Sequence, residues 1–239
     1  MYYKEKEMFD ERTKLLFGNN LSNLKEKNIL VVGIGGVGSY VCESLVRTGI
    51  KSITIVDYDK VDVTNINRQL IALNSTIGQY KVDVMKSRLQ DIDKNCIIYS
   101  HNKMLTSNNI ADIFDRKYDY VVDAIDMVDA KVSLIKYCYD NDIPCISAMG
   151  AGNKTSIPHY QVLDVYKTYN DGLAKVMRKR LRDEGVKKHL VVSSLEKSIS
   201  NDSKNIGSVM YHPAMCGLVI SAHIINDLVL KGENNESNK

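Results

Sequence analysis

Residues 28–57 read NILVVGIGGVGSYVCESLVRTGIKSITIVD, and this segment sets the architecture of the chain. The apolar run at 28–33 predicts a buried strand, and a second strand is predicted at 52–57. Between them, residues 37–48 have the apolar spacing of a helix that Gly49 is suited to end. Parallel strands need such a crossover, so the segment predicts the first strand–helix–strand unit of a parallel sheet.

The same alternation continues along the chain. Further strands are predicted at residues 96–101, 118–126 and 143–148, and further helices at 81–92, 107–114 and 128–139. We therefore expect an α/β fold with a Rossmann-like, doubly wound and mostly parallel sheet that carries helices on both faces.

After Gly152 the pattern changes. The alternating residues 159–167 predict an edge or antiparallel strand, and a strongly basic helix is predicted at 173–183. A further strand at 189–194 and a helix at 210–230 complete the chain. The sheet is thus expected to be extended by antiparallel C-terminal strands.

Composition limits the class of protein. The 239 residues carry 32 basic and 29 acidic side chains, a net charge of +3, so any basic surface must be local. The five cysteines form no C-x-x-C pair, which argues against a disulfide scaffold and a four-cysteine zinc site. The first residues are too charged for a signal peptide, and no apolar stretch is long enough to span a bilayer. We therefore expect a cytoplasmic protein without membrane contact.

Gly33, Gly35 and Gly38 form a G-x-G-x-x-G motif between the first strand and its helix. A turn without side chains lets phosphate oxygens approach the backbone at a helix N-terminus. Asp57 ends the next strand, at the spacing typical of an acid that binds ribose hydroxyls. The motif predicts a nucleotide site. Alone it is most typical of dinucleotide oxidoreductases, and glycines that serve packing only would give the same pattern.

The loop after the second strand carries more polar groups than a dinucleotide site needs. Within VDYDKVDVTNINRQ, at 56–69, they include Asp57, Asp59, Asn65, Asn67 and Arg68. Amides and an arginine suit polyphosphate oxygens. Lys81 and Asp126 follow, and a lysine with an acid suits a triphosphate and Mg²⁺. Singly each residue reads as a solvated loop charge, but their conjunction favours a nucleoside triphosphate with magnesium.

Five motifs occur in the order RTKLLFG, VVGIGGVGSY, IVDYDKVDVTNINRQ, GQYK and VVDAIDMVDAK. Over roughly residues 9–230 this order resembles the ThiF-like superfamily of adenylating enzymes, the ubiquitin-activating type. The resemblance implies ATP and Mg²⁺ as cofactors and a homodimer. The pattern along the chain indicates four parts: an N-terminal helical segment at 1–27, a nucleotide-binding core at 28–152, a subdomain at 153–232 to which the resemblance assigns substrate and dimer contacts, and a solvated tail at 233–239.

The resemblance further implies roles for single residues. The cofactor would be bound by Gly33, Gly35, Gly36, Gly38, Asp57, Asp59, Asn65, Asn67, Arg68, Lys81 and Asp126. Lys81 would stabilise charge near the α-phosphate, and Asp126 would coordinate Mg²⁺. Arg12 falls where the superfamily supplies an arginine across the dimer interface to the partner's ATP. The implied catalytic residues are Arg12, Arg68, Lys81 and Asp126.

Residues 162–182, VLDVYKTYNDGLAKVMRKRLR, resemble one subgroup, the tRNA threonylcarbamoyladenosine dehydratases. This implies ATP-dependent adenylation of the threonyl carboxylate of a modified adenosine beside the anticodon of tRNA. The neighbouring carbamoyl group then closes a ring and AMP leaves. The resemblance also implies a sulfur-relay partner of the cysteine desulfurase type, although the cysteines read as packing residues.

A tRNA substrate requires a surface that holds phosphates. The basic helix would supply it through Lys175, Arg178, Lys179, Arg180 and Arg182. The alternative is a solvated helix face whose cations pair with Asp183 and Glu184. Three tyrosines could stack a base or could be half-buried strand residues, namely Tyr160, Tyr166 and Tyr169. Residues 197–208 are polar and expected to be mobile.

Three other functions stay open. An adenylyltransferase would act on the C-terminal glycine of a ubiquitin-like sulfur carrier, but the missing C-x-x-C pairs and the basic helix count against it. A nicotinamide-dependent oxidoreductase would tolerate the loss of Arg68. A non-catalytic RNA-binding scaffold would release no AMP.

Overall fold

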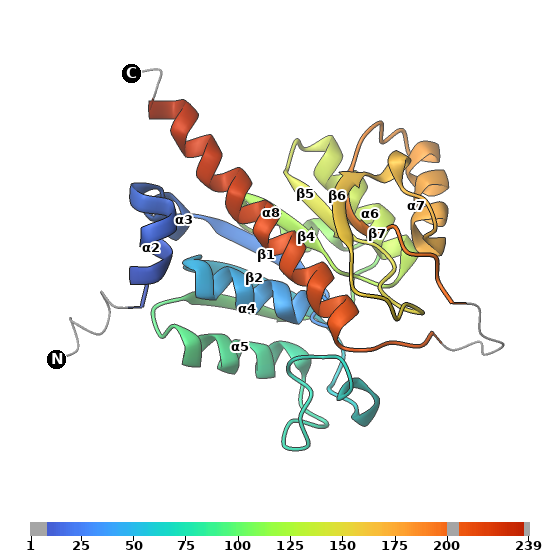
Figure 1. Ribbon diagram of the computed structural model, residues 1–239, viewed down its shortest axis with the longest axis horizontal. Coiled ribbons are helices and arrows are strands. Elements are labelled where there is room, and N and C mark those ends of the chain that lie inside the picture. Colours follow the sequence, from blue (N-terminus) through green and yellow to red (C-terminus); the bar gives the residue numbers. More distant parts are fainter. Residues whose placement is uncertain (1–8, 200–205, 237–239) are drawn as a thin grey trace.

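Seven strands form one sheet, in the order β3-β2-β1-β4-β5-β7-β6 (Figure 1). They are β1 (Asn28–Val32), β2 (Ser52–Asp57), β3 (Ile97–Asn102), β4 (Tyr120–Asp123), β5 (Cys145–Ala148), β6 (Tyr160–Asp164) and β7 (Leu190–Ser194). The structure is a computed structural model and describes residues 9–199 and 206–236. Neighbouring strands are parallel except for β6, which pairs antiparallel with β7 at the sheet edge. The predicted mostly parallel sheet with an antiparallel C-terminal extension is confirmed.

Helices cover both faces of the sheet. On one face lie α4 (Gly38–Thr48), α5 (Lys81–Ile92) and α8 (Tyr211–Glu236), and on the other lie α6 (Val128–Asp140) and α7 (Gly172–Asp183). Within the described part of the chain, none of the helices combines the length and the hydropathy that crossing a membrane requires.

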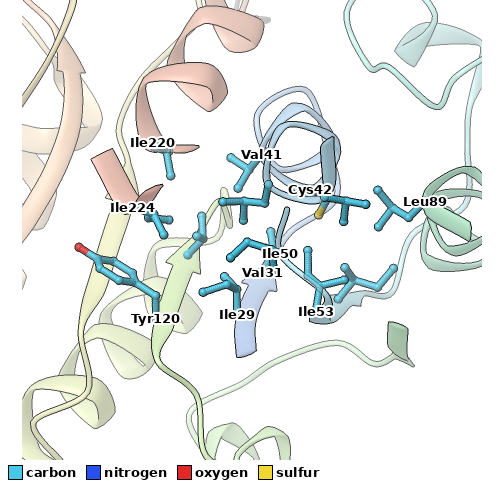
Figure 2. Close-up of a cluster of buried hydrophobic side chains, with 14 of the residues drawn as sticks. Ile29, Val31, Val41, Cys42, Ile50, Ile53, Leu89, Tyr120, Ile220 and Ile224 are labelled. Atoms are coloured by element: carbon cyan, nitrogen blue, oxygen red, sulfur yellow. The ribbon is translucent and has the colours of Figure 1, made fainter. Parts of the chain in front are cut away.

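Strand β1 explains why both faces are covered. Its side chains alternate, so Ile29 and Val31 pack under α4 and α8, whereas Leu30 and Val32 pack toward α6. Figure 2 shows the first of these two cores, in which the following side chains of α4 and α8 meet those of β1: Val41, Cys42, Ile220 and Ile224. A strand that is apolar on both sides is stable only when both sides are buried.

The remaining elements are short. Before β1 lie α2 (Glu11–Phe17), the 3-10 turn η1 (Gly18–Asn20) and α3 (Leu21–Lys25). Further 3-10 turns are η2 (Val63–Asn65), η3 (Ile110–Ile113) and η4 (Val165–Lys167). Helices α2 and α3 lie within the N-terminal helical segment expected at 1–27, of which residues 1–8 lie outside the described residues.

Two predicted elements differ in the structure. The predicted helix at 107–114 is wrong, because only η3 forms. The Asn109 side chain accepts the Thr106 N–H at 2.8 Å and donates to the Met104 carbonyl at 3.0 Å. Such local bonds compete with a helix.

Helix α8 extends to Glu236, so the predicted tail is helical up to that residue. Extending a helix that already exists costs little free energy, because the nucleation cost has been met. Residues 200–205 of the segment expected to be mobile lie outside the described residues.

The strand order brings the carboxyl ends of β1, β2 and β4 together. Val32 of β1 pairs with Val56 of β2 on one side and with Asp123 of β4 on the other. The order of strands along the chain reverses between β1 and β4. Ligands of open parallel sheets bind at such a switch point, so the loops that follow these strands are where a site is expected.

A buried histidine links β5 to β7. The Nε2 of His189, just before β7, lies 2.7 Å from the Ser147 hydroxyl of β5, and both side chains are buried. Burial, helped by the charge of Lys131, lowers the pKa of His189 from 6.5 to about 3. The folded protein therefore binds fewer protons at this site than the unfolded chain. The stability that neutral His189 contributes is therefore fully present above pH 6.5 and is lost as the pH falls toward about 3.

We expect this histidine to lower the free energy of unfolding by up to about 1.4 kcal/mol per pH unit on acidification within that window. Urea unfolding of the wild-type protein and of His189→Gln, at several pH values, measures the effect. Glutamine can keep the bond to Ser147 and does not titrate, so the variant should lose stability more gradually. Equal slopes for the two proteins would contradict the prediction.

Candidate active site

A cavity of about 370 Å³ opens at the carboxyl ends of β1, β2 and β4. The residues that were expected to bind a cofactor and that line it are Gly33, Gly35, Gly36, Asp57, Asp59, Arg68, Lys81 and Asp126. They come from four separate segments of the chain, which the sheet order brings to one place. Gly38, Asn65 and Asn67 lie outside the lining.

Close backbone approaches shape the glycine loop. Gly33 has a φ of +91°, and a Cβ there would lie 2.5 Å from the Ala124 carbonyl oxygen. A Cβ on Gly38, the first residue of α4, would lie 1.8 Å from the Gly33 carbonyl oxygen. Both positions therefore require glycine for packing. Gly35 and Gly36, like Gly33, line the cavity, and they lie beside the N-terminus of α4, where backbone N–H groups favour phosphate.

Asp57, the last residue of β2, presents its carboxylate to the cavity. Its Oδ2 accepts the Ile34 N–H at 2.6 Å, and its Oδ1 accepts the Asp59 N–H at 2.8 Å. Burial raises the pKa of Asp57, against the opposing effect of the nearby Lys81 charge. A carboxylate offers about four acceptor positions, so it can accept ribose hydroxyls in addition to these two N–H groups.

Lys81 is the first residue of α5 and is only 5% exposed. Its Nζ lies 2.7 Å from Asp59 Oδ2, and its N–H donates to the Asp59 carbonyl at 3.0 Å. A backbone bridge between Lys60 and Tyr80 closes the loop between β2 and α5. These contacts fix a buried cation at the cavity wall, where it can neutralise phosphate charge.

Arg68 lines the cavity and is oriented by its own loop. Its Nη1 donates to Asn67 Oδ1 at 2.9 Å. Asn67 donates to the Ser208 carbonyl at 3.0 Å, and Asn65 forms a reciprocal capping box with Asp62. The two asparagines therefore shape the loop, and their phosphate contacts stay predictions.

Asp126 is exposed in the turn between β4 and α6 and lines the cavity. Across residues 9–199 and 206–236, no group of three or more His, Cys, Asp or Glu side chains is arranged as a metal site. A nucleotide-bound Mg²⁺ needs no such group, because one or two carboxylates, phosphate oxygens and water satisfy it. Asp126 and Asp59 supply donors of that kind, so the residues present fit the ion.

The sequence did not point to several cavity residues. Lys103 and Leu105, which follow β3, both line the cavity. Lys103 is a cation that pairs with Asp112, and Leu105 is an apolar side chain. Gln69 is buried, and its Oε1 has no hydrogen-bond partner among the described residues, so it can accept a bond from a ligand. Gln69 ends the quoted motif IVDYDKVDVTNINRQ and could have been found there. The loop after β3 carries no motif, so Lys103 could not.

Arg12 lies far from this cavity. It is exposed on α2, which Figure 1 shows near the C-terminal part of α8, whereas Pro213 in the first turn of α8 lines the cavity. At 1.5 Å per residue, the 26 residues of α8 span about 39 Å. Arg12 therefore does not serve the cavity of its own chain.

The cations of α7 fall into two groups. Three of them, Arg178, Arg180 and Arg182, contact other parts of the chain. Their partners are the Thr168 carbonyl at 2.9 Å, the Asp129 carboxylate at 2.8 Å and the Tyr166 ring, whose centroid lies 5.4 Å from the guanidinium. These are not the expected partners Asp183 and Glu184. Lys175 and Lys179 are exposed, so they are the members best placed to meet a ligand in solution.

The three tyrosines also differ in exposure. Tyr160 is buried, with its hydroxyl 3.3 Å from His212 Nδ1, so it does not offer its ring to a base. Tyr166 donates to the Val186 carbonyl at 2.5 Å. Tyr169 is 52% exposed and is the tyrosine whose ring a base could reach.

Known proteins are similar to this chain over most of its length. A curated "tRNA threonylcarbamoyladenosine dehydratase" from Bacillus subtilis is 40% identical over 237 residues, which covers 91% of this chain and 93% of the relative. The crystal structure of Escherichia coli tRNA N6-threonylcarbamoyladenosine dehydratase, TcdA, with AMP has a TM-score of 0.90 at 37% identity and covers 94% of this chain and 95% of that chain. The complex of TcdA with ATP has a TM-score of 0.90 at 36% identity and covers 95% and 96%. Residues 10–239 match the ThiF family, and the chain belongs to that family.

Proposed function

We propose that the protein is an ATP-dependent tRNA threonylcarbamoyladenosine dehydratase that acts on cytoplasmic tRNA. One observation carries the proposal. A cavity that gathers Gly36, Asp57, Arg68, Lys81 and Asp126 belongs to a chain that is 40% identical over 237 residues to a relative of that name. Glycine backbone, two cations and carboxylates are the groups that a nucleoside triphosphate and its metal require.

The reaction would have two steps. The threonyl carboxylate attacks the α-phosphorus of ATP, the bond to the bridging oxygen breaks, and pyrophosphate leaves. The carbamoyl group of the same nucleoside then attacks the acyl carbon, the bond to AMP breaks, and the ring closes with loss of a proton. Adenylation is needed because a carboxylate oxygen is a poor leaving group and AMP a good one. Ring closure is intramolecular, which lowers its barrier.

The chain's own residues would bind the nucleotide and oppose its charge. Gly35 and Gly36 would receive phosphate oxygens, and Asp57 would hold the ribose. Arg68 and Lys81 would stabilise the charge that develops as pyrophosphate leaves. Mg²⁺, when bound by Asp126, would neutralise phosphate oxygens further.

Purified protein, ATP, Mg²⁺ and tRNA that carries threonylcarbamoyladenosine test the proposal. We expect AMP, pyrophosphate and a nucleoside that is lighter by one water, seen by mass spectrometry after mild extraction. A ubiquitin-fold sulfur carrier in place of the tRNA is the comparison. Adenylation of the carrier with the tRNA unchanged would favour the sulfur-carrier adenylyltransferase. Binding of NADH without release of AMP would favour an oxidoreductase.

We further propose a homodimer in which Arg12 completes the partner's nucleotide site. Beside Arg12 on α2, Leu15 and Leu16 are 84% and 81% exposed. Neighbouring large apolar side chains on a surface are typical of a region that a partner covers. The distance of Arg12 from its own cavity supports the same arrangement.

Mixed dimers should show this arrangement. Arg12→Ala and Asp126→Ala should each abolish AMP formation, because each removes a charge from every site of the homodimer. A heterodimer of the two variants has one complete site, in the subunit that keeps Asp126 and receives Arg12 from its partner. We expect AMP formation to return in purified heterodimers. Inactive heterodimers would show that Arg12 does not act across the interface.

We also propose that α7 presents Lys175 and Lys179 to tRNA phosphates. The charge reversal Lys175→Glu with Lys179→Glu should weaken tRNA binding and lower the slope of log affinity against log salt by about 2, because two phosphate contacts are lost. Filter binding at several salt concentrations measures the slope. Lys94→Glu, an exposed lysine after α5, is the control and should change little. An unaltered slope in the double variant would remove α7 from the RNA surface.

A sulfur-relay partner that passes sulfur to this chain would need a thiol that it can reach. All five cysteines are described, and only Cys145 is partly exposed. Burial raises the pKa of Cys216 to about 12, so its thiolate is scarce at neutral pH. Such a partner would therefore have to meet Cys145 or act without a thiol of this chain.

A further inference from the structure

A fully buried ion pair lies directly behind the turn that carries Asp126. The Lys131 Nζ of α6 and the Asp123 Oδ2 at the end of β4 are 2.8 Å apart, and both side chains are 0% exposed. The ammonium also donates to the carbonyls of Ile125, at 3.1 Å, and of Asp123, at 3.5 Å. Asp123 Oδ1 accepts the Ile125 N–H at 3.1 Å. Each of these contacts ends on residues 123–125.

Those residues lead into the cavity wall. Residues 124–127 all line the cavity, and Asp126 is the exposed member. On the opposite side, the Ala124 carbonyl packs so closely against Gly33 that a Cβ there would come within 2.5 Å of its oxygen. The turn is therefore held between the ion pair and the glycine loop. Its position determines where the Asp126 carboxylate stands.

Stability alone does not account for this pair. Taking two charges out of water costs several kcal/mol per ion, and apolar residues of similar volume are often as stabilising or more so. A pair whose contacts all end on one turn is better suited to fixing the geometry of that turn. Residues behind a metal ligand commonly act in this way, and their loss typically lowers metal affinity or activity by 10- to 100-fold.

We propose that Lys131 and Asp123 are positioning residues for the metal side of the nucleotide site, which hold the turn at 124–127 so that Asp126 meets the Mg²⁺ of bound ATP. The inference rests on the proposed function. It predicts a selective effect. Binding of ATP with Mg²⁺ depends on the pair, whereas binding of ATP alone depends on the glycine loop, Asp57 and Lys81, which lie on other segments.

Titration calorimetry with the full chain tests this selectivity. ATP is titrated once with Mg²⁺ and once with EDTA, into the wild-type protein and into the double variant Lys131→Met with Asp123→Asn. The double variant removes the ammonium contacts and leaves no unpaired buried charge. We expect the gain in ATP affinity from Mg²⁺ to fall about tenfold, with the affinity in EDTA unchanged. Should the double variant not fold, Lys131→Gln with Asp123→Asn takes its place with the same expectation, because it also leaves no unpaired buried charge.

Lys51→Met is the matched control. Lys51 pairs with Asp93 in a partly buried ion pair at the start of β2, the opposite end of that strand from the cavity. Its loss should lower stability and leave the Mg²⁺ gain as in the wild type. Equal losses in both titrations of the double variant, or no loss in either, would overturn the inference alone. A wild-type protein whose ATP affinity does not respond to Mg²⁺ would overturn the proposed metal role of Asp126 and the inference with it.

Discussion

Lys81→Met should lower the rate of AMP formation by a factor of about 100 to 1000 and leave the fold intact. The Lys81 ammonium is held 2.7 Å from Asp59 at the cavity wall, so it is oriented before the nucleotide arrives. A cation that is already in place needs no reorganisation as charge develops on pyrophosphate, and this makes its effect on the barrier large. Methionine retains the buried volume of the side chain and removes only the charge.

Steady-state AMP formation with saturating tRNA measures the effect, which we expect mainly in kcat. The Asp59 carboxylate is 46% exposed, so the loss of its partner should cost little stability, and thermal unfolding checks this. Lys86→Met, on the same helix and outside the cavity lining, is the control and should keep the wild-type rate. A folded Lys81→Met protein with normal turnover would rule out the role assigned to this lysine.

Gly38→Ala should destabilise the protein by about 3 kcal/mol or more and abolish ATP binding. The added Cβ would lie 1.8 Å from the Gly33 carbonyl oxygen, so the backbone of the loop itself must move. Gly33 has little room to yield, because it packs against the Ala124 carbonyl on its other side. Intrinsic helix propensity alone would make the alanine variant more stable by about 1 kcal/mol. A loss of stability would therefore come from the clash and not from helix propensity.

Gly172→Ala is the matched control for this prediction. Gly172 is the first residue of α7, as Gly38 is of α4, but a Cβ there would meet nothing within 4 Å. We expect its stability to be unchanged or raised by up to about 1 kcal/mol. Urea unfolding of both variants gives the comparison. Similar stabilities for the two alanine variants would contradict the packing argument.

The sequence predicts most of the sheet because its strands are apolar runs bounded by glycine or polar residues. The edge position of β6 also follows from its alternating residues. The predicted helix at 107–114 fails because a single side chain, Asn109, binds the local backbone, a competition that helical spacing does not reveal. Helix α8 exceeds its predicted end because packing of its apolar face supports a polar last turn.

The candidate site is predictable where a residue belongs to one of the quoted motifs. Asp57, Asp59 and Lys81 do, and the structure brings them to one cavity. The contact between Asn67 and Ser208 joins residues 141 positions apart, which no local pattern shows. Lys131 is harder still, because a lysine in a helix normally predicts an exposed position. Its burial depends on the end of β4 lying against the first turn of α6.

The first turns of α8 pack against the glycine loop at the cavity. A Cβ on Gly36 would come within 3.1 Å of Pro213, and a Cβ on Gly217 would come within 2.6 Å of the Val37 carbonyl oxygen. A fragment that stopped after β5 would retain every residue expected to hold ATP and would still leave bare the apolar surface of α4 that this helix covers. We therefore expect the smallest autonomous version of the enzyme to include α8 and thus nearly the entire chain.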